Sequence, residues 1–372
     1  MIQICKCVCS CTLLLLLGLR VLADETIAIK ADHIDTVTSD VIENGVILIQ
    51  DGKISELGTD VEVPSGAEVI DAGDKTVFPG IVHPYSTIGL SYPGSGGPAS
   101  NPHYRVADEL YPFQDEYKRI LQAGFTTLAL VPMGQGIAGQ GAIVRPVGKS
   151  CEAMLIAESG LLVIGFRTSE NAKRVIKGAF ESAKKKPDPK DPKIEPLTRA
   201  LQGKIPTIAM CPWPRDTIHL LELLKPYDKM KLVLLAGPEN YRVADKLAKQ
   251  KIPVIYPAQI DFEQFTRDRV NVPKTLAEAG VKIACTPKTN NVTGYEDFLR
   301  QMAELVKSGL DRETARKAIT INPAEMLAMD YRLGSLEAGK DANLLILTGD
   351  PLEAGTQICK VMIEGKIVYQ TP

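Results

Sequence analysis

Histidine is scarce in this sequence, and neither sign of charge is in excess. Only 4 His occur among 372 residues, and 43 Lys and Arg stand against 45 Asp and Glu, which gives a net charge of −2. A protein that binds nucleic acid through its phosphates carries a basic excess, so we predict no nucleic-acid partner. The G-x-S-x-G motif of serine hydrolases is absent too, and no other pattern identifies a nucleophile.

Cysteines with the spacing of a metal site are also absent. Of the 8 Cys, four lie near the amino terminus and the other four stand too far apart for a zinc knuckle. A disulfide between two of these would suit an exported protein, but the spacing identifies no pair, and we predict that they are small buried apolar residues. The eight are Cys5, Cys7, Cys9, Cys11, Cys151, Cys211, Cys285 and Cys359.

The amino-terminal segment has an apolar core from Thr12 to Leu22. Gly18 and Arg20 interrupt this core, which is shorter than the ~20 apolar residues that a transmembrane helix needs. The small residue Ala23 follows it, as at the cleavage site of a secretory signal peptide. We therefore predict a signal peptide over residues 1–23, export to the periplasm or the extracellular space, and no stable membrane span.

Both ends of the remaining chain show β-strand patterns. Residues 24–78 contain short runs of alternating polar and apolar residues around Asn44-Gly45 and Asp51-Gly52, and such pairs are typical of tight hairpin turns. Residues 333–372 carry the same pattern between glycines. We predict that the two segments together form one small β-sandwich domain.

The intervening residues 79–325 alternate strand-like apolar runs with helical patterns. This alternation is typical of parallel β/α units, which build both open sheets and closed barrels. The pattern alone does not distinguish the two. Residues 183–196 are rich in Lys and Pro without apolar periodicity, and we predict a solvent-exposed loop there.

Two segments resemble the amidohydrolase superfamily. Leu333–Gln370 reads LGSLEAGKDANLLILTGDPLEAGTQICKVMIEGKIVYQ and is similar to the closing segment of that family, and Pro79–Leu90, PGIVHPYSTIGL, is similar to its first barrel strand. The resemblance is closest to imidazolonepropionase-like members. It implies a distorted (β/α)8 TIM barrel over residues 79–325. It also implies hydrolysis of non-peptide C–N bonds, such as those of cyclic amides, with zinc or another divalent metal.

The sequence departs from the family pattern at the metal ligands. The family's first strand reads PGLIDxHxH, and a gapless match puts His83 at the Asp and Tyr85 and Thr87 at the two His. A catalytic zinc site needs three protein ligands. Because the later ligand positions are changed too, we predict no metal ion and no other cofactor. Those later positions are Met210–Trp213 and Ala236, where the family has His, and Cys285–Pro287, where it has Asp.

A barrel still leaves a cavity where loops follow the carboxyl ends of its strands. The residues predicted to ring it are aromatic, amide and charged, which suits a small polar ligand held by hydrogen bonds and stacking. Ordinary loops would have the same composition. The predicted residues are His83, Tyr85, Arg167, Trp213, Glu239, Asn240, Lys288, Asn290 and Asn291.

Two functional hypotheses follow. In the first, the chain is an exported amidohydrolase-like pseudoenzyme that binds a small ligand or a partner, either an active relative or a second copy of itself. In the second, it is an active C–N hydrolase with a rearranged or metal-free site, in which His83 and Tyr85 act as acid and base. The sequence names no substrate for either hypothesis.

Overall fold

The computed structural model describes residues 26–90 and 97–371. The predicted signal peptide over residues 1–23 lies outside these ranges. Among the helices within them, none has the length and apolar content needed to span a bilayer.

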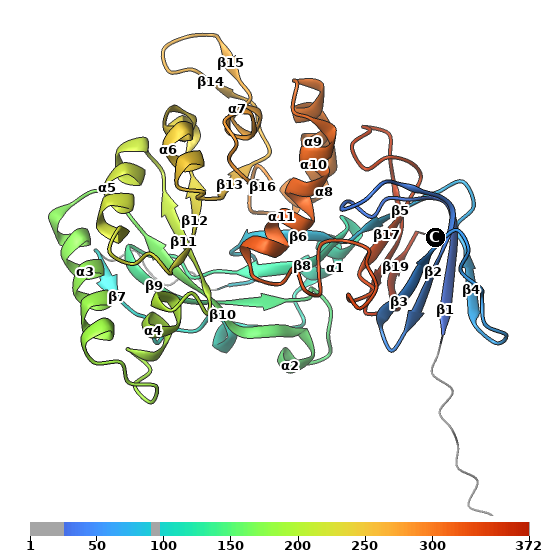
Figure 1. The fold of residues 1–372 in the computed structure, drawn as a ribbon, viewed down its shortest axis with the longest axis horizontal. Helices are drawn as coiled ribbons and strands as arrows, with labels where there is room; N and C mark the ends of the chain where they lie inside the picture. Colours follow the sequence, from blue (N-terminus) through green and yellow to red (C-terminus); the bar gives the residue numbers. More distant parts are fainter. Residues whose placement is uncertain (1–25, 91–96, 372) are drawn as a thin grey trace, which may run out of the picture.

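Strands from both ends of the chain build one sheet, on the right in Figure 1. The central strand β1 pairs with β2 and also, in parallel, with β4 along its first half and β5 along its second. Strand β17 pairs with β5 and joins the carboxyl-terminal residues to this sheet. The strands are β1 (Ile27–Ile34), β2 (Ile42–Gln50), β3 (Lys53–Gly58), β4 (Glu68–Asp71), β5 (Thr76–Pro79), β17 (Leu344–Leu347), β18 (Ile358–Ile363) and β19 (Lys366–Gln370).

One of the two predicted turns in this unit is present. Asp51 and Gly52 have φ of 50° and 75° and connect β2 to β3, as a two-residue hairpin requires. The other predicted turn is wrong, because β2 continues through Asn44 and Gly45, and Gly45 pairs with Ala31. Asn44 adopts a φ of 52° within the strand, a conformation that Asn tolerates better than most residues.

The second sheet forms a nearly closed barrel, which confirms the predicted fold class of a distorted TIM barrel beside a β-rich unit. Its order is β16-β13-β12-β11-β10-β9-β8-β6, and β16 lies against β6 at the seam. Seven of these strands run in one direction, whereas β9 is antiparallel to both neighbours. The strands are β6 (Ile81–Ser86), β8 (Phe125–Leu130), β9 (Gly136–Val144), β10 (Leu155–Gly165), β11 (Pro206–Cys211), β12 (Lys231–Ala236), β13 (Val254–Pro257) and β16 (Ile283–Thr286).

The helices cover the outside of the barrel through apolar faces (Figure 1). In α3, Ala172, Ile176, Phe180 and Ala183 are buried at helical spacing, and the Ser169 hydroxyl caps the first turn. The helix continues to Lys185, so the predicted loop begins later than expected. The helices are α1 (Asp115–Gln122), α2 (Cys151–Met154), α3 (Glu170–Lys185), α4 (Glu195–Leu201), α5 (Pro214–Leu224), α6 (Ala244–Lys249), α7 (Val272–Glu278), α8 (Val292–Glu296), α9 (Phe298–Lys307), α10 (Arg312–Ile319) and α11 (Ile321–Met326), with short η1 (Val106–Glu109) and η2 (Pro238–Val243).

A separate apolar cluster fills the barrel interior. Each of the eight barrel strands contributes to it, for example Val82 from β6, Ile208 from β11 and Val233 from β12. Tyr85, Met210 and Leu235 pack against the same cluster nearer the carboxyl ends of those strands. Because strand side chains alternate between two faces, these three residues mark the inward positions closest to the face where barrel enzymes place their sites. Strand β7 (Ala99–Ser100) adds to the barrel sheet by pairing with β9, and β14 (Asp261–Phe262) and β15 (Arg269–Val270) form a separate two-stranded sheet.

Candidate functional site at the carboxyl ends of the barrel strands

A cavity of about 510 Å³ opens at the carboxyl ends of β10, β11 and β12, beside the loop that joins β8 to β9. Its volume falls within the range of small-molecule sites. Most of the lining is apolar or backbone, and one lining residue is a cation. The lining residues are Met133, Gly134, Gln135, Arg167, Met210, Cys211, Pro212, Leu235, Ala236 and Gly237.

Arg167 is the only residue of this lining with a full charge at neutral pH. It stands two residues after the end of β10, and its side chain is exposed. Within the described part of the chain, its guanidinium makes no hydrogen bond or ion pair that would neutralise it. This placement was predicted from the sequence. Because the guanidinium lines the cavity without such a partner, it can meet an anionic group of a ligand.

The next residue along the chain is anchored to a buried carboxylate. Asp216 Oδ1 accepts hydrogen bonds from the Thr168 backbone N–H at 2.8 Å and from the Thr168 hydroxyl at 2.7 Å. Asp216 is fully buried in the first turn of α5, and its Oδ2 has no hydrogen-bond partner among the described residues. Asp216 was not predicted from the sequence, although an acidic residue two positions after Pro214 at a helix start was an available signal.

A second set of buried hydrogen bonds ties the neighbouring strand ends. The Thr217 hydroxyl donates to Asn240 Oδ1 at 2.6 Å, and the Asn240 amide donates to the Cys211 carbonyl at 3.1 Å. Asn240 is completely buried, so it holds the loop after β12 against β11 and does not ring the cavity. The floor of the site is thus fixed by side chains from α5 and η2.

His83 lies outside the cavity lining. Its ring packs against Phe125 and Tyr295, with ring centroids 5.7 and 5.1 Å apart, and it is 2% exposed. Burial lowers the pKa of His83 from 6.5 to about 3, so the imidazole is neutral. Its Nδ1 accepts a hydrogen bond of 3.0 Å from the Tyr85 backbone N–H, which assigns the ring proton to Nε2.

Tyr85 occupies the inward position at the end of the first barrel strand. Its hydroxyl donates to the Met210 sulfur at 3.2 Å, so the two inward side chains of β6 and β11 meet across the interior. The inward residue of β11 is therefore Met210, whereas Cys211 and Ala236 belong to the outer core cluster. These geometries could not be read from strand sequences without knowing which face each residue takes.

A hydrogen-bonded chain links β6 to the loop after β16. The Ser86 and Tyr295 hydroxyls lie 2.6 Å apart, and Tyr295 donates to Asn290 Oδ1 at 3.0 Å. The Asn290 amide in turn donates to the Thr87 hydroxyl at 2.7 Å. Asn290 therefore closes the barrel seam. Its neighbour Asn291 caps α8 by accepting from Gly294 N at 2.9 Å, an ordinary structural role.

The remaining predicted residues lie apart from the cavity. Trp213 is 44% exposed at the start of α5, and Glu239 lies in η2 within 4.0 Å of Arg242. Lys288 lines a different cavity of about 490 Å³ beside β13 and β16. Of the predicted residues, the structure brings only Arg167 into the lining at the ends of β10 to β12.

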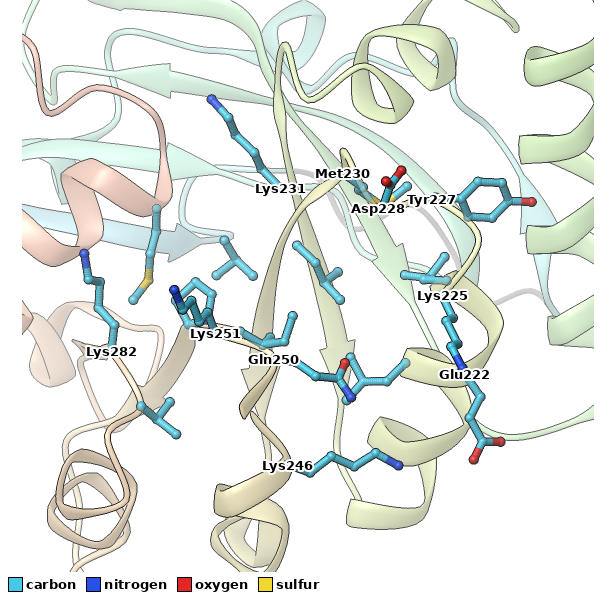
Figure 2. A pocket seen from close by; sticks show the side chains of 18 of the residues that line it. Glu222, Lys225, Tyr227, Asp228, Met230, Lys231, Lys246, Gln250, Lys251 and Lys282 are labelled. Carbon is cyan, nitrogen blue, oxygen red and sulfur yellow. The ribbon is translucent and has the colours of Figure 1, made fainter. Parts of the chain in front are cut away.

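A larger cavity, of about 1180 Å³, lies at the opposite face, where β12, β13 and β16 begin (Figure 2). Five lysines line it, and Lys225 stands at the carboxyl end of α5. Lys225 at the end of α5 and Lys246 in the last turn of α6 complement the negative ends of helix dipoles, and this end of a barrel is usually structural. We therefore assign this cavity no function. Its lysines are Lys225, Lys231, Lys246, Lys251 and Lys282.

The four described cysteines are free. Cys211 and Cys285 are buried, as predicted, whereas Cys151 and Cys359 are half-buried. Burial, and to a smaller extent the charge of Asp216, raises the pKa of Cys211. Burial raises the pKa of Cys285 to about 12. Both thiols are therefore protonated at neutral pH and unsuited to act as thiolate ligands or nucleophiles.

Comparison with known proteins connects this architecture to one family. Residues 208–368 match the profile described as "Amidohydrolase family". The chain is 23% identical to amidohydrolase tasK of Hapsidospora irregularis over 88% of this chain and 40% of that protein. It is 43% identical to imidazolonepropionase of Geobacillus sp. (strain WCH70) over 53 residues, which are 12% of each chain. The chain thus spans less than half the length of either curated relative.

The structural match is longer. The crystal structure of an amidohydrolase from Thermotoga maritima MSB8 superposes with a TM-score of 0.80 at 26% identity, covering 93% of this chain and 100% of that one. Barrel and terminal β unit together therefore follow the same plan in both proteins.

These matches overturn the prediction that the chain has no cofactor, because amidohydrolase family members use a divalent metal. The inward side chains at the strand ends do not fit the usual ligand set. Tyr85 places a phenol there, Met210 a thioether and Leu235 an isobutyl group. A catalytic zinc ion is bound instead by three His, carboxylate or thiolate ligands. No three His, Cys, Asp or Glu side chains of residues 26–90 and 97–371 are grouped as a metal site.

Proposed function

The chain belongs to the amidohydrolase superfamily, and we propose that it is an exported, catalytically impaired member that binds a small ligand in the cavity of about 510 Å³. The family's activity is hydrolytic, and its scaffold is present from the terminal sheet to the barrel.

The observation that carries the proposal is the contact between Tyr85 and Met210. The family's reaction needs a water molecule activated close to the inward ends of the strands, where a metal lowers the pKa of that water to about 7. Here the Tyr85 hydroxyl donates to the Met210 sulfur at those strand ends, and we infer that this contact takes the place of the water. A neutral thioether neither accepts a proton from water at pH 7 nor anchors a hard cation strongly.

Acid and base catalysis by the neighbouring residues is also weak in this geometry. A general base needs a pKa near the working pH, whereas the pKa of His83 is lowered to about 3 by burial. Its ring is enclosed by Phe125 and Tyr295, away from the cavity lining. His83 therefore supports the barrel wall and does not meet a ligand.

A ligand-binding role remains supported by the cavity itself. Its walls are fixed by Asp216 and Asn240, which are both fully buried, and such pre-organised walls lower the entropic cost of binding.

The amino-terminal segment supports export. Amino-terminal sequencing of the secreted protein is expected to begin just after Ala23; a mature chain that retains Leu13–Leu17 would contradict export by this route.

The proposed function is tested by binding and turnover on one panel of cyclic amides, ureas and N-acylated amino acids. We expect calorimetric binding of at least one compound without hydrolysis. Gln135→Trp places a bulky side chain in the lining and should abolish binding, while Gln202→Trp, on an exposed turn, should not. Turnover comparable to active amidohydrolases would establish the second hypothesis, an active C–N hydrolase with a rearranged site.

A further inference from the structure

We propose that the ligand of the cavity carries a carboxylate, that Arg167 binds this carboxylate, and that Asp216 positions Arg167. The inference rests on the proposed function, because it specifies the chemistry of the ligand for the same cavity. Arg167, Thr168 and Asp216 belong to the strand end and helix start that border the cavity.

Charge defines the kind of ligand. The lining holds one cation and no acid, and Arg167 has no protein partner among the described residues. Such a site favours an anionic group by direct pairing and disfavours a cationic one by repulsion. The planar guanidinium offers two parallel N–H donors that match the two oxygens of a carboxylate.

The position of Arg167 is built by its neighbour. Thr168 directs both its backbone N–H and its hydroxyl to the same oxygen, Asp216 Oδ1, at 2.8 and 2.7 Å. A charged acceptor that is fully buried makes stronger hydrogen bonds than one in water. The loop after β10 is thereby fixed at the residue next to Arg167, which reduces the entropy lost when a ligand binds.

The rest of the lining defines the rest of the ligand. Met133, Met210 and Leu235 present apolar side chains, and Gln135 adds an amide. An aliphatic group beside an amide and a carboxylate matches this surface. We therefore assign the cavity to small N-acylated amino acids with aliphatic side chains.

Isothermal titration calorimetry with N-acetylleucine and N-acetylleucinamide tests the assignment, because the two compounds differ in the carboxylate alone. The wild-type protein should bind the acid at least about tenfold more tightly, corresponding to one charge-assisted hydrogen-bonded pair. Arg167→Met should abolish this preference by weakening binding of the acid. Arg167→Lys should keep only part of this preference, since an ammonium group cannot form the two parallel hydrogen bonds that a guanidinium forms with a carboxylate. Arg174→Met, on the exposed side of α3, serves as the control and should keep the full preference.

Positioning by Asp216 is tested separately through Thr168. Thr168→Val removes the hydroxyl donor and should reduce the acid-to-amide preference several-fold while the amide still binds. Thr168→Ser retains the hydroxyl and should restore the preference. A purely structural role would lower the melting temperature of the Val variant without changing the ratio of the two affinities, and this result would overturn the positioning role.

The outcomes separate the two proposals. Equal affinities for acid and amide, or a preference that Arg167→Met leaves intact, would overturn the carboxylate assignment. So would binding of neither compound. Hydrolysis of either compound would overturn impaired catalysis. The Arg167-dependent preference would still be decided by the affinities of the wild type and of Arg167→Met for the acid and the amide.

Discussion

The Asn290 side-chain amide donates a hydrogen bond of 2.7 Å to the Thr87 hydroxyl, so the end of the first barrel strand is joined to the loop after the last. Tyr295 extends the link by donating to Asn290 Oδ1 and meeting Ser86 at 2.6 Å. In the family pattern, Thr87 stands at a metal-ligand position. Here hydrogen bonds close the barrel seam at that place.

Removal of the Ser86–Tyr295 hydrogen bond should destabilise the seam. Tyr295 and Ser86 are both completely buried, so Tyr295→Phe leaves the Ser86 hydroxyl short of a partner and should cost about 1–3 kcal/mol of unfolding free energy. Ser86→Ala with Tyr295→Phe should cost less than the two single changes added together. Urea denaturation of the four proteins measures this coupling, and strict additivity would show that the two hydroxyls do not interact.

His83 should make the protein less stable as pH falls below 6.5. Its pKa is about 3 in the folded protein and 6.5 ordinarily, so the unfolded chain binds a proton in this window that the folded chain does not. The contribution is complete above pH 6.5 and is lost as pH falls toward 3, by up to about 1.4 kcal/mol per pH unit. In denaturation series at pH 7, 6 and 5, His83→Asn should show a shallower decline than the wild type. Parallel declines would contradict the burial of a neutral imidazole.

Replacing Tyr85 and Thr87 together by His should raise the affinity for zinc without producing turnover. Tyr85 lies at an inward position of β6, and Thr87 follows the end of that strand beside the loop after β16. Two imidazoles remain short of the three ligands of catalytic zinc. Calorimetric zinc titration of this double variant beside the wild type checks the expectation. If the zinc affinity did not change, the alignment of residues 79–90 with the family's first strand would be wrong.

Gly165→Ala should be strongly destabilising. A Cβ at Gly165 would lie 1.8 Å from the Gly134 carbonyl oxygen, so the loop between β8 and β9 could no longer pack against the end of β10. A backbone clash of this kind costs about 2–4 kcal/mol. Gly178→Ala meets no atom within 4 Å and is the matched control, which should be neutral or slightly stabilising within its helix. Equal melting temperatures for the two variants would argue against the close approach at Gly165.

The sequence predicted the parts of the fold that depend on local residue preferences and on motifs shared with the family. The Asp51-Gly52 turn follows from left-handed φ values that Gly and Asp adopt readily. The barrel followed from the alternation of strands and helices together with the resemblance. The antiparallel direction of β9 was not predicted, because the apolar pattern of a strand does not indicate its direction. Only the Gly-rich turn before β9 indicates that the chain reverses there.

The site could be predicted only in part, for a geometric reason. Arg167 was found because a cation directly after a barrel strand must stand at the carboxyl face. His83 was expected in the cavity but packs outward, where a register shift after it breaks the simple alternation of β6. The position of the family's later His was given only as the span Met210–Trp213, since the sequence does not state which of these residues turns inward; the structure shows that Met210 does.

The most direct test of the account is turnover by the wild-type protein. Hydrolysis of the same panel of cyclic amides, ureas and N-acylated amino acids should be measured at high enzyme concentration, with Zn²⁺, Mn²⁺ or Co²⁺ supplied in turn, and compared with Met210→Ala. If the Tyr85–Met210 contact takes the place of the activated water, as proposed, neither protein should hydrolyse the panel above the uncatalysed rate, while calorimetry detects a bound ligand. Multiple turnovers by the wild-type protein that depend on an added metal would contradict it.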